Sequence, residues 1–406
     1  MKNKKLILCI GGSSESLIGI KTVKKMGFGI IVADYSKKSK AVKICDYFIN
    51  ESTKNPLKIL KKIKTSIKKN IVGVVSFGND VPFEVNFIAK KLKLKYYNLK
   101  AAKILSNKLL IRKFLKKNKI NSTSFHEIKK FHHLKKVINK YPLGVIKPVD
   151  SSGARGVFLL NKKTKNIKKI FFNSLSFSKS QTCIFEKFIN GDQLSTETVI
   201  YNNSAYTFGI SDRNYNRINE FYPNIIEDGS DMPSKYENKF KESINKLMLD
   251  VARKLKIDNC ILKGDLVVNN NKIYVVEIAG RLSGGNFSSI MIPRSVGINL
   301  IKCAIKLCAN LRLTPNDFEI KYNNHVSQRF IFTQKKGVLK EIKLPKWIKN
   351  SKKLVFKELN YSKGDKIEKI TNHTNRLGQI IVCDKNKKKT VEFAKRVIRE
   401  TKLDII

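Results

Sequence analysis

The segment from Ile261 to Phe287, ILKGDLVVNNNKIYVVEIAGRLSGGNF, constrains the fold more than any other part of the chain. Two apolar, β-branched runs flank the polar residues 269–272, which is the pattern of a β-hairpin. The first run carries Asp265 and the second carries Glu277. A buried carboxylate needs a cation or a metal ion beside it, because burying it unpaired is costly. A hairpin register can bring both acids to one face, so we expect a site for a divalent metal and phosphate.

Arg281 and the glycine pair 284–285 follow the second run and would complete such a site. The same residues also allow a simpler interpretation. In that interpretation the hairpin is purely structural, and Glu277 forms a salt bridge with Arg281.

The first hundred residues alternate apolar runs with amphipathic segments, which predicts a parallel α/β sheet that resembles a Rossmann-like unit. Gly11–Ser14 and Ser76–Asp80 follow two of the expected strands. We expect both loops at the carboxyl edge of the sheet, where they would face a common cleft, although either could be an ordinary turn. The dinucleotide fingerprint GxGxxG is incomplete, so dehydrogenase activity is a weak alternative.

A loop rich in serine and glycine, residues 150–156, lies between two apolar runs. Its backbone N–H groups could surround phosphate oxygens, but the Walker sequence GxxxxGK[ST] is absent. Lys147 ends the apolar run before this loop, and lysine is rarely buried without a partner. A plain hairpin loop is the alternative.

The net charge of +50 suggests nucleic acid, but the lysines are spread along the whole chain and no RNA- or DNA-binding motif is present. We therefore expect no specific nucleic-acid partner. The seven cysteines are scattered without metal-ligand spacing, which favours a reducing, cytoplasmic compartment. No apolar run reaches the ~20 residues that a membrane span requires.

Four motifs occur in a particular order: a Rossmann-like opening, KPVDSSGARGV, EKFING and the D…EIAGRLSGG hairpin. In this order the chain resembles the ATP-grasp superfamily, and within it the carboxylate–amine/thiol ligases related to D-alanine–D-alanine ligase, biotin carboxylase and carbamoyl phosphate synthase. The resemblance implies an α/β and α+β fold: a Rossmann-like domain, a two-subdomain ATP-grasp fold and a small C-terminal α/β closing domain. The expected boundaries are 1–105 for the first domain, 106–185 for the lid, 186–325 for the platform with the metal site, and 326–406 for the closing domain.

The resemblance also implies roles for individual residues. Arg281 and Lys147 would be catalytic, and Asp265 and Glu277 would hold the metal. The nucleotide would be bound by Lys108, Lys147, Ser151, Ser152, Gly153, Gly156, Glu186, Lys187, Ile189 and Gln193. Two positions depart from the pattern: Gln193 stands where many relatives have an acid, and Ala279 stands where they have a third metal ligand, an asparagine.

The implied function is an ATP-dependent, ADP-forming ligase that activates a carboxylate as an acyl phosphate and joins it to an amine. It would use ATP with Mg²⁺ or Mn²⁺ and act on small molecules, without a membrane, and a homodimer is compatible with the resemblance. A nucleotide-binding sensor or scaffold without turnover and a basic nucleic-acid-binding protein are the alternatives.

Overall fold

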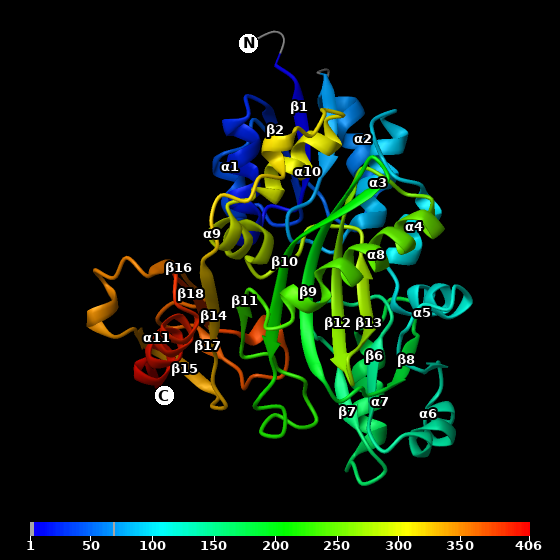
Figure 1. Cartoon of the computed structure of the whole chain (residues 1–406), viewed down its shortest axis with the longest axis vertical. Helices are drawn as coiled ribbons and strands as arrows, with labels where there is room; N and C mark the ends of the chain where they lie inside the picture. Colours follow the sequence, from blue (N-terminus) through cyan, green and yellow to red (C-terminus); the bar gives the residue numbers. More distant parts are fainter. Residues whose placement is uncertain (1–3, 68–69) are drawn as a thin grey trace.

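A four-stranded parallel sheet, in the order β3-β2-β1-β4, begins the chain, and the computed structural model describes residues 4–67 and 70–406 (Figure 1). The two central strands, β1 and β2, are buried on both faces, as their continuous apolar sequences require. Ile7 and Cys9 pack toward α1 and α10, whereas Leu6 and Leu8 pack toward α2 and α3. The elements are β1 Leu6–Ile10, α1 Leu17–Lys25, β2 Gly29–Asp34, β3 Tyr47–Asn50, α2 Pro56–Ser66, β4 Ile71–Val75, α3 Pro82–Lys91, α4 Leu99–Leu105 and, from far along the chain, α10 Leu300–Cys308.

A small antiparallel sheet, in the order β5-β8-β6-β7, follows after helix α5. Ile146 and Phe185 from its strands pack with Phe171 from α7 in a separate apolar core. Residues 149–157 connect β6 to β7, which confirms the expected loop between two strands. The elements are α5 Lys108–Lys117, β5 Phe125–Ile128, α6 Phe131–Val137, β6 Gly144–Pro148, β7 Phe158–Leu160, α7 Ile167–Ser176 and β8 Cys183–Lys187.

The central sheet has eight antiparallel strands in the order β13-β12-β9-β10-β11-β14-β18-β16. Helix α8 packs against β9 and β10, and its residues Ile244 and Met248 are fully buried. The elements in this part are β9 Asp192–Tyr201, β10 Ser204–Asn214, β11 Gly229–Met232, α8 Glu237–Leu255, β12 Cys260–Asn269, β13 Lys272–Ala279 and α9 Ile292–Val296.

The C-terminal segment extends the central sheet rather than standing apart from it. Strand β14 pairs with β11, and β18 and β16 follow outward from β14. Three further strands form a separate sheet in the order β17-β15-β19. The elements are β14 His325–Ile331, β15 Gly337–Lys343, β16 Leu354–Leu359, β17 Lys366–Ile367, β18 Gly378–Asp384, α11 Lys387–Glu400 and β19 Lys402–Ile405. The expected fold class, a parallel α/β sheet followed by mixed sheets and a C-terminal α/β part, is confirmed.

Strands β12 and β13 form the predicted hairpin. Only Asn270 and Asn271 connect them, and both have positive φ values, 46° and 58°, as a type I′ turn requires. The register pairs Asp265 with Glu277 and Leu266 with Val275, so Val276 is an extra residue in β13, a β-bulge. The bulge lies beside the two acids and sets the face that Glu277 occupies.

Candidate nucleotide and metal site

One face of the central sheet carries the predicted acids in a row across neighbouring strands. Glu277 on β13 pairs with Asp265 on β12, Asp265 with Ser195 on β9, and Ser195 with Ser211 on β10. Residues directly opposite one another in antiparallel strands share a face. The Ser195 hydroxyl donates to Asp265 Oδ1 at 3.1 Å. The two acids therefore lie side by side, as the sequence predicts.

The neighbouring row on this face contains Ala279, Lys263, Glu197 and Gly209. Glu197 is completely buried, and both of its oxygens accept the Ser283 backbone N–H, at 3.0 and 3.2 Å. Burial raises the pKa of the Glu197 carboxyl to about 7, although these hydrogen bonds act in the opposite direction. Glu197 thus anchors the loop that follows Arg281.

Cations from three elements surround the two acids. The Lys263 ammonium contacts the Asp265 carboxylate, and Arg213 Nη1 lies 3.4 Å from Asp265 Oδ2. Lys108 Nζ, from the first turn of α5, lies 3.6 Å from Glu277 Oε2. Burial alone would raise the pKa of Glu277, but Lys108, Lys263 and other nearby cations hold it well below its usual value. Glu277 is thus held in the anionic form that a metal ligand requires.

A second charged group is tighter and more deeply buried. Glu186 on β8 accepts from Lys147 Nζ and from Arg112 Nε, both at 2.6 Å, and all three side chains are less than a tenth exposed. Arg112 also donates to the carbonyls of Val275 and Val276 at the bulge, at 2.9 and 2.6 Å. Burial lowers the pKa of Lys147 while Glu186 opposes that shift. This group joins the small sheet to β13 and fixes Lys147 beside the acids.

The loop 150–156 lies over this arrangement. The Lys108 ammonium donates to the Ser151 carbonyl at 2.7 Å, and the backbone N–H of His373 donates to the Gly153 carbonyl at 3.1 Å. Gly153 has a φ of 69°, which favours glycine. Gly156, with a φ of 71°, lies against the backbone of Ser174 on α7, where a Cβ would approach it to 3.2 Å.

A cavity of about 240 Å³ lies between this loop and the central sheet. It is lined by every predicted site residue except Gly156, which packs on α7 instead. Gln193 lines the cavity, whereas Asp192 points to the surface and bonds Lys235 and the Tyr236 hydroxyl. The predicted residues that line the cavity are Lys108, Lys147, Ser151, Ser152, Gly153, Glu186, Lys187, Ile189, Gln193, Asp265, Glu277 and Arg281.

Arg281 joins this cavity to a larger one. Its Nε donates to Asp80 Oδ1 at 3.0 Å, while the salt bridge of Glu277 is to Lys108, so the expected Glu277–Arg281 salt bridge of the simpler interpretation is wrong. The larger cavity, about 490 Å³, is lined by both predicted loops of the first sheet, the glycine pair 284–285 and parts of the C-terminal segment. The two cavities share Arg281, Asp265 and Lys263.

The glycine turn of the first sheet is filled by the protein itself. Asn79 occupies the space above Gly11 and donates to the Ile10 carbonyl at 3.2 Å, and the Gly12 N–H is bonded to Asp34. Gly11 and the Gly12 N–H are thus already engaged by contacts within the protein.

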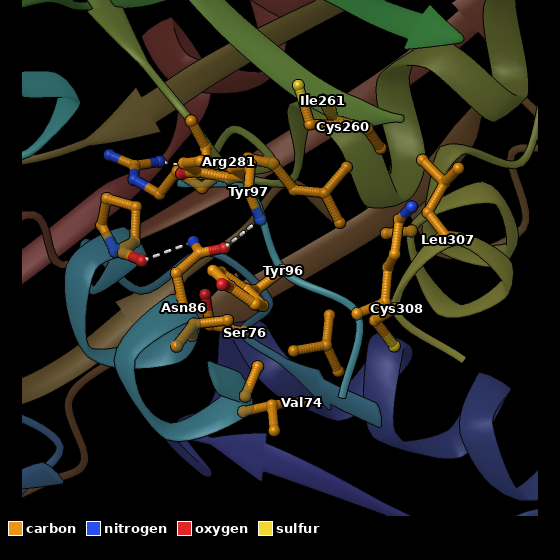
Figure 2. A pocket seen from close by; sticks show the side chains of 18 of the residues that line it. Val74, Ser76, Asn86, Tyr96, Tyr97, Cys260, Ile261, Arg281, Leu307 and Cys308 are labelled. Atoms are coloured by element: carbon orange, nitrogen blue, oxygen red, sulfur yellow. Dashed lines mark hydrogen bonds between the residues drawn. The ribbon is translucent and has the colours of Figure 1, made fainter. Parts of the chain in front are cut away.

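Figure 2 shows a third, smaller pocket of about 110 Å³ that Arg281 also borders. Residues from β4, α3, β12 and α10 line it, together with residues 95–97 and 280–282. Tyr97 donates from its hydroxyl to the Gly280 carbonyl and from its backbone to Asn86, both at 2.9 Å. These bonds hold the end of β13, and therefore Arg281, against the first sheet.

Sequence reasoning missed four residues of this site: Arg112, Glu197, Lys263 and His373. Arg112 could not be told apart from the other basic residues of α5. Its partners, the carbonyls of Val275 and Val276, lie at a bulge that no sequence pattern predicts. The alternation of β12 could have revealed Lys263, since it lies two residues before Asp265. His373 comes from a turn of the C-terminal segment, and no local pattern marks it.

The donor set fits one divalent ion. Asp265 and Glu277 supply carboxylate oxygens, the ligands that Mg²⁺ and Mn²⁺ favour. Within residues 4–67 and 70–406, no cluster of three or more His, Cys, Asp or Glu side chains could hold a metal ion.

In the same residues, no helix is both long and apolar enough to cross a bilayer.

Comparison with known proteins gives two family matches. Residues 105–285 match the ATP-grasp domain, and residues 329–405 match the L-amino acid ligase C-terminal domain 2. No match was found among curated proteins.

Solved structures share the fold over the whole chain. L-amino acid ligase from Bacillus licheniformis has 18% identity and a TM-score of 0.84, with 100% of both chains covered. Phosphoribosylglycinamide synthetase from Anaerococcus prevotii has 20% identity and a TM-score of 0.75, again with 100% of both covered. The biotin carboxylase domain dimer of Hydrogenobacter thermophilus 2-oxoglutarate carboxylase, in complex with MgADP and bicarbonate, has 14% identity and a TM-score of 0.74, with 100% of this chain and 92% of that chain covered.

Proposed function

We propose that this chain, which matches the ATP-grasp domain over residues 105–285, is an ATP-dependent, ADP-forming ligase that joins a carboxylate to an amine. The observation that carries the proposal is the pairing of Asp265 with Glu277 on one sheet face, in a cavity shared with Lys147 and the loop 150–156. The match of residues 329–405 to an L-amino acid ligase domain supports amino acids as both substrates.

The proposed division of the chain follows the boundaries expected from the sequence: residues 106–185 act as a lid and residues 186–325 as a platform. The adenine ring lies along the segment Glu186–Ile189. The phosphates lie under Ser151, Ser152 and Gly153, with Lys108 and Lys147 as cationic contacts.

Asp265 and Glu277 are the residues that would hold Mg²⁺ or Mn²⁺. Such an ion, when bound, neutralises charge on the phosphate oxygens during transfer.

In the first step an oxygen of the substrate carboxylate attacks the γ-phosphorus of ATP. The bond to the bridging oxygen breaks, ADP leaves with that electron pair, and an acyl phosphate forms. Arg281 and Lys147 balance the negative charge that spreads over the transferred group. Asp80 fixes the Arg281 guanidinium and raises its pKa, so Arg281 stays protonated throughout.

In the second step the amine nitrogen attacks the acyl carbon, the carbon–oxygen bond to phosphate breaks, and inorganic phosphate leaves. The amine proton passes to solvent or phosphate. Closure of the loop 150–156 excludes water, which would otherwise hydrolyse the acyl phosphate.

Glu277→Gln tests the proposal, because it keeps the shape of the side chain but removes a metal ligand charge. Amino-acid-dependent ADP release should fall by about 100- to 1,000-fold while the circular dichroism spectrum stays unchanged. Glu242→Gln, on the exposed surface of α8, is the matched control and should keep full activity. Near-normal turnover of Glu277→Gln would remove Glu277 from the site.

The same assay separates the alternatives. A sensor or scaffold would bind ATP without releasing phosphate in the presence of a carboxylate and an amine. A nucleic-acid-binding protein would instead show salt-dependent retention on DNA or RNA.

A further inference from the structure

Lys263 occupies a particular place on the metal-binding face. It lies two residues before Asp265 on β12, so both side chains point to the same face, and its Cα partner on β13 is Ala279. Its side chain is 14% exposed, and its ammonium contacts the Asp265 carboxylate. No other carboxylate lies within salt-bridge distance of this ammonium in the described part of the chain.

The position opposite Lys263 on β13 offers no metal ligand, and Glu197, the residue opposite it on β9, has both carboxylate oxygens bonded to the Ser283 N–H. The Ala279 side chain is a buried methyl group without an oxygen. Phosphoryl-transfer sites commonly clamp the phosphates with two divalent ions, each needing its own oxygen ligands. Asp265 and Glu277 suffice for one ion, and no third candidate ligand joins them among the described residues.

The other cations near the acids have further partners. Arg213 is held by Glu227 through two bonds of 3.0 and 3.1 Å. Lys108 donates to the Ser151 carbonyl of the loop, and its Nζ is 3.6 Å from Glu277. Lys263 alone has Asp265 as its single ion-pair partner, faces a small residue and lines both cavities.

We propose that the Lys263 ammonium is a built-in cation that takes the place of a second divalent ion, so the nucleotide is bound with one metal ion per chain. This inference rests on the proposed function and deepens it. The ammonium supplies positive charge and three N–H donors to the phosphate or acyl oxygens, but it cannot coordinate them. Lys263 would therefore contact the reacting groups directly.

The test counts Mn²⁺ ions by electron paramagnetic resonance, with the non-hydrolysable analogue AMP-PNP at the same concentration as the protein. Wild type and Ala279→Asn should each saturate at one Mn²⁺ per chain, because the ammonium still fills the second place. The double variant Lys263→Ala/Ala279→Asn should gain a second bound Mn²⁺. Lys263→Arg keeps the positive charge and should bind one Mn²⁺ ion per chain. Lys272→Ala removes an exposed lysine from the same hairpin and should also bind one.

Two Mn²⁺ ions in wild type, or a second ion in Ala279→Asn alone, would overturn the inference while leaving the ligase proposal intact. A double variant that folds and still binds one ion would overturn it as well. Complete absence of Mn²⁺–AMP-PNP binding by wild type would instead overturn the proposed function and this inference with it.

If the double variant does not fold, Lys263→Met provides the test instead, since it keeps the apolar part of the side chain and removes only the charge. At one equivalent of Mn²⁺ its affinity for AMP-PNP should fall about tenfold, as for one lost charge-assisted hydrogen bond. Excess Mn²⁺ should restore that affinity. An unchanged affinity would contradict the proposal.

Discussion

Two groups of buried charges lie within the same site, and they differ in how deeply their side chains are buried. Lys147, Glu186 and Arg112 form contacts of 2.6 Å with side chains less than a tenth exposed. Around Asp265 and Glu277 the contacts to Arg213 and Lys108 are 3.4 and 3.6 Å, whereas Lys263 contacts Asp265 closely. The side chains of this second group are between 12% and 22% exposed.

The difference separates charges that are already matched by deeply buried partners from charges that are more open to the cavity. Buried pairs at short distance neutralise one another inside the protein, and removing one partner leaves an uncompensated charge. Pairs that are partly exposed to the cavity can exchange partners when a metal ion or a phosphate arrives. We refer to the first set, residues 112, 147 and 186, as the tight group, and to the second, residues 108, 213, 263, 265 and 277, as the loose group.

Glu186→Gln should produce the largest effect on stability, because it leaves two buried cations in the tight group without their carboxylate. We expect the free energy of unfolding to fall by about 3–5 kcal/mol, measured by urea denaturation. Glu127→Gln, on the neighbouring strand β5, breaks an exposed pair with Lys113 and should cost less than about 1 kcal/mol. Equal losses in the two variants would erase the distinction between the groups.

Glu197 sharpens the comparison, because it is fully buried on the same face as the loose group but has no salt bridge among the described residues. Burial raises its pKa from 4.5 to about 7, so the folded state binds the proton more tightly than the unfolded state. Its contribution to stability is therefore complete below pH 4.5 and is lost as the pH rises to 7.

Across that range, the free energy of unfolding of wild type should fall by about 3 kcal/mol relative to that of Glu197→Gln, because glutamine has no proton to release. Denaturant titrations of both proteins at several pH values measure this difference. Parallel pH profiles would show that folding does not raise the pKa of Glu197.

Lys108→Met should give the smallest change in stability, less than about 1 kcal/mol, because Lys108 belongs to the loose group. It should nevertheless weaken AMP-PNP binding by about 10- to 100-fold, as expected for a lost hydrogen bond to a charged group. Isothermal titration calorimetry gives the affinity, with Lys113→Met on the same helix as control. If the variant binds AMP-PNP as well as wild type, Lys108 does not contact the phosphates.

Local patterns were enough to predict the hairpin and its acids. Alternation placed Asp265 and Glu277 in strands, and the two asparagines supply the positive φ values that fix a two-residue turn and therefore the register. The serine- and glycine-rich loop was recognisable for the same reason, since its composition depends on the local backbone conformation and not on distant contacts.

Contacts between distant segments could not be read in the same way. Arg281 is paired with Asp80, 201 residues away, and not with the nearby Glu277. Arg112 finds its carbonyl partners only because an extra residue bends β13. Helix α10 covers the first sheet although it follows the hairpin in sequence. Each of these contacts depends on how distant segments pack in three dimensions, so no single stretch of sequence predicts it.

The pairing of β11 with β14 has a practical consequence for work with fragments. A chain cut after residue 325 would keep the ATP-grasp segment but would leave β11 as an open edge in the middle of what is now a continuous sheet. Unpaired edges readily recruit strands from other molecules. Truncated versions should therefore aggregate, and crystallisation or assays should use the full chain.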